Sequence, residues 1–156
     1  MLMLLFKIGN ERYAITSQEV IEVLPMVLLK TLPHTPEHIA GVFNYRGRIV
    51  PVLDLCQLIR SKPCSNNLST RIILVNYCRG NHTQNVLGLM AEQVVETLHK
   101  SESELVDSHI HIDAAPYLGK ILLDKQGIIH CIQIENLLSE TEQINFLSEN
   151  LLNTVI

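Results

Sequence analysis

The sequence contains no tryptophan and no surplus of positive charge. Aromatic residues make up 4% of its 156 residues, and the formal net charge is −4. Such a chain offers neither a positive field for phosphates nor aromatic platforms on which bases could stack. Nucleic acid is therefore not an expected partner.

Long apolar runs are missing as well, because no run approaches the roughly 20 residues that a bilayer-spanning helix needs. Residues 1–6 are apolar but lack a basic leader and a small-residue cleavage site, and Lys7 interrupts them early. We read this stretch as a first strand, and we expect a protein that stays in the cytoplasm without membrane insertion. The cysteines form no Cys-x-x-Cys pair and are predicted to be reduced thiols: Cys56, Cys64, Cys78 and Cys131.

Catalytic motifs are scarce. The chain has 7 glycines and neither a Gly-x-Ser-x-Gly motif nor a phosphate-cradling glycine loop, so we expect no enzymatic activity and no cofactor. Two histidine patterns leave a metal-dependent hydrolase as a distant alternative. His34 and His38 frame a His-x-x-Glu-His pattern, but Pro36 would open a helix that leaves His34 outside. The run His109-Ile110-His111-Ile112-Asp113 would place ligands on one face of a strand, although a solvent-facing strand is the commoner reason for such alternation.

The remaining composition is typical of one globular domain. Hydrophobic residues make up 47% of the chain and charged residues 18%, and a domain of this length can bury about two-thirds of its unfolded surface.

Residues 41–55 are the most informative stretch, because two apolar runs flank a short polar tip. Gly47 permits a tight turn, so the pattern predicts a β-hairpin with Arg46 projecting from its tip. The apolar run after the tip predicts a buried second arm, in which Pro51 marks an edge or a bulge. Asp54, followed three residues later by Gln57, predicts the start of a short helix.

The same signals predict the other elements. Strands are expected at residues 4–8, 13–15, 26–29, 71–78, 86–90, 121–123 and 128–134, and a loop at 61–70. Residues 17–24 predict a helical turn, and Thr35 and Pro36 predict a one-turn helix that ends at Gly41. The tail from about residue 135 to about residue 155 predicts an amphipathic helix.

Two stretches are repeated along the chain. Residues 13–24 align without gaps with residues 87–98, and residues 49–59 align with residues 128–138. We therefore predict two similar halves, at about 13–62 and about 71–138, within a single domain over 1–156, with strand exchange of the termini. Short strands without long helices between them favour a mostly β fold of small antiparallel barrels.

Residues 41–55 closely resemble the signature of the CheW-like domain, the receptor–kinase coupling module of bacterial chemotaxis. That signature reads Gly-hydrophobic-x-Asn-x-Arg-Gly, then hydrophobic-hydrophobic-Pro-hydrophobic-hydrophobic-Asp-Leu, and every fixed position is filled. The resemblance extends from residues 4–9 to residues 132–138. It implies two five-stranded SH3-like barrels packed around a shared core, with short helices and a C-terminal helix.

The resemblance also implies binding rather than catalysis. The partners would be the cytoplasmic tip of a methyl-accepting chemotaxis receptor and the regulatory domain of a CheA-type histidine kinase, in arrays at the inner face of the membrane. The alternative is a related adaptor for surface sensing or twitching motility, since Tyr45 replaces a commoner leucine. In the second half, Met90-Ala91-Glu92-Gln93 replaces a more usual Val-Val-Asp run, at the groove that would face the receptor.

The site residues that the resemblance implies fall into two groups. An ion pair between Glu22 and Arg46 is expected to orient the guanidinium toward a partner. The partner-binding positions are Val20, Glu22, Gly41, Asn44, Arg46 and Gly47, and the structural positions are Pro51, Asp54 and Gly119.

Overall fold

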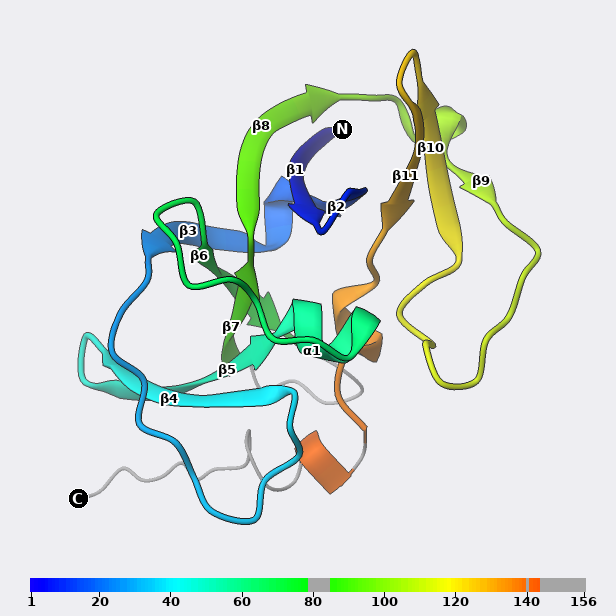
Figure 1. Ribbon diagram of the computed structural model, residues 1–156. Coiled ribbons are helices and arrows are strands. Elements are labelled where there is room, and N and C mark those ends of the chain that lie inside the picture. The colour runs from blue at the N-terminus through cyan, green and yellow to red at the C-terminus, as the bar shows by residue number, and fades with distance from the viewer. Residues whose placement is uncertain (79–84, 140, 144–156) are drawn as a thin grey trace.

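The computed structural model describes residues 1–78, 85–139 and 141–143. Its strands form a six-stranded sheet and a five-stranded sheet (Figure 1). In the part of the chain that is described, no helix combines the length and the apolar character needed to cross a membrane. The predicted mostly β class, with two similar strand assemblies, is confirmed.

The six-stranded sheet, called sheet A, combines the first strands of the chain with the last. Its order is β8 (Gln93–His99), β1 (Leu2–Ile8), β2 (Glu11–Thr16), β11 (Gly127–Cys131), β10 (Lys120–Asp124) and β9 (Val106–Asp107). The five-stranded sheet, called sheet B, has the order β3 (Val20–Pro25), β6 (Arg71–Tyr77), β7 (Asn85–Ala91), β5 (Arg48–Asp54) and β4 (Ile39–Tyr45). The short helices are η1 (Ser17–Glu19), α1 (Leu55–Arg60), η2 (Glu102–Glu104) and η3 (Ile134–Asn136).

The sequence repeat corresponds to two places where the chain passes from one sheet into the other. Residues 13–24 cover β2 and β3, and residues 87–98 cover β7 and β8. At both places the chain leaves one sheet and enters the other, as the continuous run from β7 into β8 shows in Figure 1. Each sheet therefore contains strands from both repeated stretches.

One detail of the barrels differs from the prediction, because not every pairing is antiparallel. Strand β5 pairs with β7 in parallel, and β11 pairs with β2 in parallel. Only strands joined by a hairpin must reverse direction. These pairs join strands that are far apart in the sequence, so no tight turn dictates their direction.

Apolar clusters lie inside each sheet and between the sheets. Side chains alternate across a strand, so a strand that is apolar on both faces can serve two clusters. In β6, Ile72 and Leu74 belong to the cluster inside sheet B, whereas Ile73, Val75 and Tyr77 belong to the cluster shared with β1 and β2 of sheet A. This double burial explains why residues 72–75 form a continuous apolar run.

Several local predictions were wrong. The sequence predicts a helical turn through residue 24, but only η1 is helical, because β3 follows at once and pairs with β6. Residues 26–29 form no strand, and only a single bridge from Lys30 to Val42 follows them. Pro36 begins a turn, closed by a hydrogen bond from the Ile39 N–H to its carbonyl (3.0 Å), and Gly41 lies within β4 rather than at a helix end.

The C-terminal helix begins later than the prediction of residue 135. Residues 141–143 are helical. The Glu142 N–H donates to Ser139 Oγ (3.2 Å), and the Ser139 N–H donates to the Glu142 carboxylate (3.0 Å). This reciprocal pair has the pattern of a capping box at the start of a helix. The predicted helical residues from 144 onward lie outside the described residues.

Candidate functional site

The β4–β5 hairpin forms as predicted, and its tip is shaped by backbone geometry. Arg46 has φ 51° and Gly47 has φ 88°, which is the combination that two-residue hairpin turns prefer. The Gly47 N–H donates to Asn44 Oδ1 (2.8 Å). Asn44 and Gly47, both predicted to bind partners, therefore shape the turn that presents Arg46.

Arg46 projects from the tip as predicted. Its side chain is 77% exposed, and Nη2 lies 3.5 Å from Oε1 of Glu22, whose side chain is 36% exposed. The guanidinium carbon also lies 5.2 Å from the centre of the Tyr45 ring, within the range of a cation–π contact. The predicted ion pair is thus present, and together with the ring it orients the guanidinium.

Glu22 and Tyr45 join the two edges of sheet B. Glu22 lies in β3 and Tyr45 in β4, which are the outer strands of this sheet. The Tyr45 hydroxyl donates to Glu22 Oε1. This hydrogen bond raises the pKa of Tyr45, because the phenol must stay protonated to donate, and partial burial adds to the shift.

Tyr45 was not among the predicted site residues. Its contacts with Glu22 and Arg46 place it at the centre of the tip, and Phe43 packs against its edge at 6.4 Å between ring centres. The only signal in the sequence was an aromatic residue beside the tip arginine, where the family usually has leucine.

Val20 and Gly41 are two further positions that were predicted to bind partners. Val20 is half-buried and packs on the cluster shared by the two sheets. Gly41 has φ 149°, and a Cβ atom there would lie 2.6 Å from the Lys30 carbonyl oxygen. Gly41 therefore allows the close approach of Lys30, and its predicted contact with a partner stays a prediction.

Gly119 precedes β10, and its carbonyl accepts the Ser108 N–H (2.9 Å). A Cβ atom at Gly119 would meet nothing within 4 Å. The close backbone approach that requires glycine at position 41 is thus not repeated at position 119.

Pro51 sits inside sheet B and not at an edge, since β5 lies between β4 and β7. Its partner in β4 is Val42, whose N–H and C=O both bond to Lys30 at 2.9 Å. Val42 therefore needs no hydrogen bond from position 51. The parallel pairing with β7 begins one residue later, at Val52. Proline is tolerated here because neither neighbour uses its missing N–H.

Asp54 takes the predicted N-cap position of α1. Its carboxylate accepts the Gln57 N–H (3.1 Å) and, through the other oxygen, the Cys64 N–H (3.0 Å). The buried side chain thereby fixes both the helix start and the loop that follows the helix.

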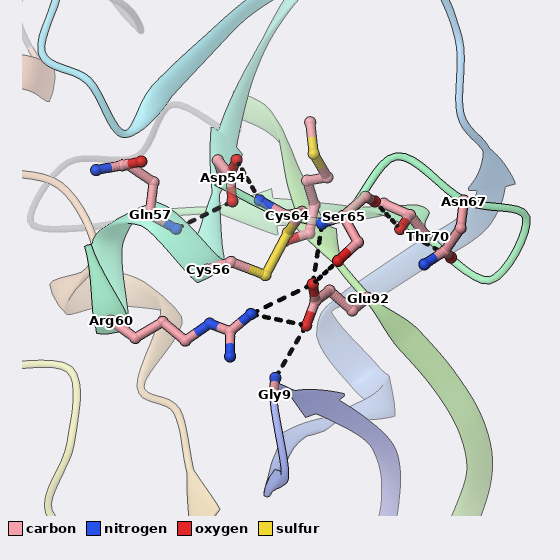
Figure 2. Close-up of a disulfide and its surroundings, with 11 residues drawn as sticks. Gly9, Asp54, Cys56, Gln57, Arg60, Cys64, Ser65, Asn67, Thr70 and Glu92 are labelled. Atoms are coloured by element: carbon pink, nitrogen blue, oxygen red, sulfur yellow. Dashed lines mark hydrogen bonds and ion pairs between the residues drawn. A yellow bond between two sulfur atoms is a disulfide. The ribbon is translucent and has the colours of Figure 1, made fainter. Parts of the chain in front are cut away.

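The prediction of reduced thiols is wrong for one pair of cysteines. Cys56, in α1, and Cys64, in the following loop, form a disulfide (Figure 2). Their sulfur atoms and a carboxylate oxygen of Asp54 also lie within 4.8 Å of one another, which is close enough for a metal site if the thiols were free. Cys131 is a free thiol, as predicted, and burial raises its pKa to about 11.

The Glu92 carboxylate, beside this disulfide, accepts several hydrogen bonds. It accepts the Gly9 N–H (2.9 Å), the Ser65 N–H (2.9 Å) and the Ser65 hydroxyl (2.7 Å), and Arg60 Nη2 lies 3.2 Å away (Figure 2). The two backbone donors, with Ser65 Oγ and Arg60, lower the pKa of Glu92 to about 2. Sequence reasoning noted residue 92 only as a departure from the family pattern.

The two histidine patterns do not form the geometry that metal binding would need. The segment from His34 to His38 contains turns instead of a helix, and His38 Nε2 lies 2.6 Å from Glu142 Oε2. Residues 108–112 have no regular secondary structure, so the alternation of His109, His111 and Asp113 does not produce one strand face.

Comparisons with known proteins agree with this geometry. A sequence profile described as the CheW-like domain matches residues 2–142. A probable chemotaxis protein CheW from Rhizobium etli is 27% identical over 140 residues, which cover 88% of this chain and 86% of the relative. Protein FrzA from Myxococcus xanthus is 35% identical over 96 residues, which cover 60% of each chain.

A solved structure has the same fold. The crystal structure of scaffolding protein TtCheW from Thermoanaerobacter tengcongensis superimposes with a TM-score of 0.74 at 27% identity, covering 85% of this chain and 84% of that one. The profile match spans most of the chain, and the hairpin with its exposed arginine lies inside it. The chain therefore belongs to the CheW-like domain family, whose members are coupling adaptors of the chemotaxis type.

Proposed function

We propose that this chain couples a methyl-accepting chemoreceptor to a CheA-type histidine kinase, and that Arg46 contacts a partner. The exposure of Arg46 carries this proposal. Asn44 and Gly47 use polar atoms to shape the turn, whereas a guanidinium has five N–H donors and Glu22 approaches only one nitrogen of Arg46. The other donors are available to an acceptor on a partner.

The backbone of Arg46 supports the same role. Its φ of 51° lies in the left-handed region, which costs a residue other than glycine about 1–2 kcal/mol. Residues held in this region often lie at functional sites, where the surrounding structure fixes the conformation. Ile49, two residues beyond the turn, is 69% exposed and would add apolar area to a contact at the hairpin.

Measuring the binding of the kinase regulatory domain tests the proposal directly. Calorimetric titration with the regulatory domain of the cognate kinase should show micromolar binding, as is typical of small signalling interfaces. Arg46→Ala should weaken binding by about 1–3 kcal/mol. Arg46→Lys should recover little of it, since an ammonium cannot reproduce the planar fork.

The matched control is Arg48→Ala, which removes another exposed arginine from the same hairpin and should bind nearly as the unchanged chain does. Arg46→Ala should also alter the free energy of unfolding by less than about 1 kcal/mol, since the ion pair is exposed. A folded Arg46→Ala variant that binds both the kinase domain and the receptor tip normally would remove the proposed role.

A second candidate is an adaptor of a non-flagellar pathway, such as surface sensing or twitching motility. The tyrosine at position 45, where the family usually has leucine, favours it. Both candidates use the same kinds of partner. A pull-down from the native host, followed by identification of the captured receptor and kinase, would separate them.

A further inference from the structure

We propose that the Cys56–Cys64 disulfide is a redox-reversible site, reduced by a dithiol reductant, whose state decides how firmly residues 61–70 are held against Glu92. The inference rests on the proposed function in one respect: an adaptor of this kind works in the cytoplasm. In that compartment a disulfide is transient or redox-sensing rather than permanent.

The local fold brings the two cysteines together and leaves Cys64 the more exposed of the two. Helix α1 ends at Arg60, and Ser61 takes the left-handed conformation (φ 61°), which reverses the chain. The Cα atoms of Cys56 and Cys64 are then 5.1 Å apart. Cys56 is fully buried, Cys64 is half-buried, and residues 61–63 are exposed. Cys64 also packs against two apolar clusters, but it is the more exposed of the two cysteines, so attack at its sulfur is the less hindered.

The disulfide is one residue away from the Glu92 contacts. Ser65 follows Cys64, and its N–H and hydroxyl both donate to Glu92 Oε2 (Figure 2). The other oxygen of Glu92 accepts the Gly9 N–H, which belongs to the turn between β1 and β2 of sheet A. Arg60, at the end of α1, lies against both oxygens at 3.2 and 3.4 Å.

Glu92 itself stands where the chain passes from β7 in sheet B to β8 in sheet A. The Glu92 carboxylate thus links three segments: the loop after α1, the end of α1, and the turn between β1 and β2 of sheet A. It lies in the run Met90-Ala91-Glu92-Gln93, which departs from the usual family pattern. The disulfide holds Ser65 in place, and Ser65 helps to hold Glu92 between the sheets.

The proposed reaction is a thiol–disulfide exchange with a dithiol such as a thioredoxin-type protein. One reductant thiolate attacks Cys64 Sγ, the Cys56–Cys64 bond breaks, and Cys56 leaves as a thiolate that takes up a proton. The second reductant thiol then attacks the mixed disulfide and releases Cys64. Two electrons and two protons pass to the protein, and the reductant becomes a disulfide.

Reduction should loosen the contacts around Glu92. The chain should stay folded, because Asp54 still caps α1 and the apolar clusters remain. The test measures amide hydrogen exchange of the whole chain, by nuclear magnetic resonance, in dithiothreitol buffers of increasing reducing strength. Intact mass reports the redox state in each buffer. We expect the bond to be reduced in the reducing buffers, and the Ser65 and Gly9 amides then to exchange roughly tenfold faster, since both lose a firmly held charged acceptor.

Variants separate this mechanism from general loosening. Cys64→Ser should show the fast exchange in every buffer, and Cys78→Ser should behave as the unchanged chain does. In Glu92→Gln the Gly9 amide should already exchange fast, and reduction should add little.

Several outcomes would overturn the inference. These are a bond that stays closed in the reducing buffers, cysteines that never pair, a reduced protein that holds a metal ion in stoichiometric amount, and a Gly9 amide that exchanges equally fast in both redox states. None of these measurements requires a partner, so the result does not depend on whether the kinase domain binds.

Discussion

Glu92 makes a sharp prediction about stability at acid pH. Its pKa is lowered from 4.5 to about 2 by the hydrogen bonds from Gly9 and Ser65 and by Arg60. A carboxyl group with a lowered pKa in the folded state stabilises the protein above its unfolded pKa. That contribution is lost as the pH falls from about 4.5 through about 2.

The size of the effect follows from the shift. Each pKa unit corresponds to about 1.4 kcal/mol, and some of this is screened because Arg60 is partly exposed, so about 2–3 kcal/mol should be lost over that range. Glu92→Gln should be less stable by a similar amount at neutral pH, because an amide nitrogen replaces an acceptor oxygen and faces backbone donors.

Urea unfolding at several pH values between 2 and 7 provides the measurement. Other carboxylates also titrate in this range, so the informative quantity is the difference in unfolding free energy between the unchanged chain and Glu92→Gln. That difference should shrink toward zero as the pH approaches 2. A difference that stays constant with pH would show that the charge of Glu92 contributes nothing and would refute the reasoning.

Two further substitutions test the fold. Gly41→Ala should lower the free energy of unfolding by about 2–4 kcal/mol, because a Cβ atom would meet the Lys30 carbonyl at 2.6 Å on a backbone with φ 149°. The matched change Gly119→Ala should stay within about 0.5 kcal/mol, and equal effects in urea unfolding would contradict this explanation. Arg12→Ala should lower the melting temperature by several degrees, because Arg12 forms a bidentate ion pair with Asp124 at 2.6 and 2.7 Å that ties β2 to the β10–β11 turn. A melting temperature unchanged in calorimetry would show that this pair is dispensable.

Local signals predicted the hairpins and the loop, since these depend on residues next to one another. The β4–β5 hairpin followed from Gly47 and the flanking apolar runs, and the cap of α1 followed from Asp54 and Gln57. Residues 20–24 show where local signals fail. Their alternation of half-buried and exposed side chains fits a strand paired with β6, and that partner lies about 50 residues later, beyond the reach of a capping argument.

The candidate site was predictable in part for the same reason. Arg46 and Glu22 were identified through the family resemblance, whereas the role of Tyr45 depends on the contact between the two outer strands of sheet B. The Cys56–Cys64 pair was missed because the spacing of two cysteines does not reveal that Ser61 reverses the chain between them. Glu92 has no local signal at all, since its partners come from three separate segments.

The exchange of strands between the sheets has a consequence for synthesis on the ribosome. Strands β3 and β4 are made early, yet they are the outer strands of sheet B, and β6 and β7 are made later to fill its centre. In sheet A, β1 can pair with β2 early, but its other edge stays unpaired until β8 has been made, as the pairing of Leu2 with His99 shows. Such distant pairings raise the contact order and slow folding. A nascent chain that has reached only the loop after α1 therefore carries unpaired strand edges, and it must avoid association with other chains until its second half emerges.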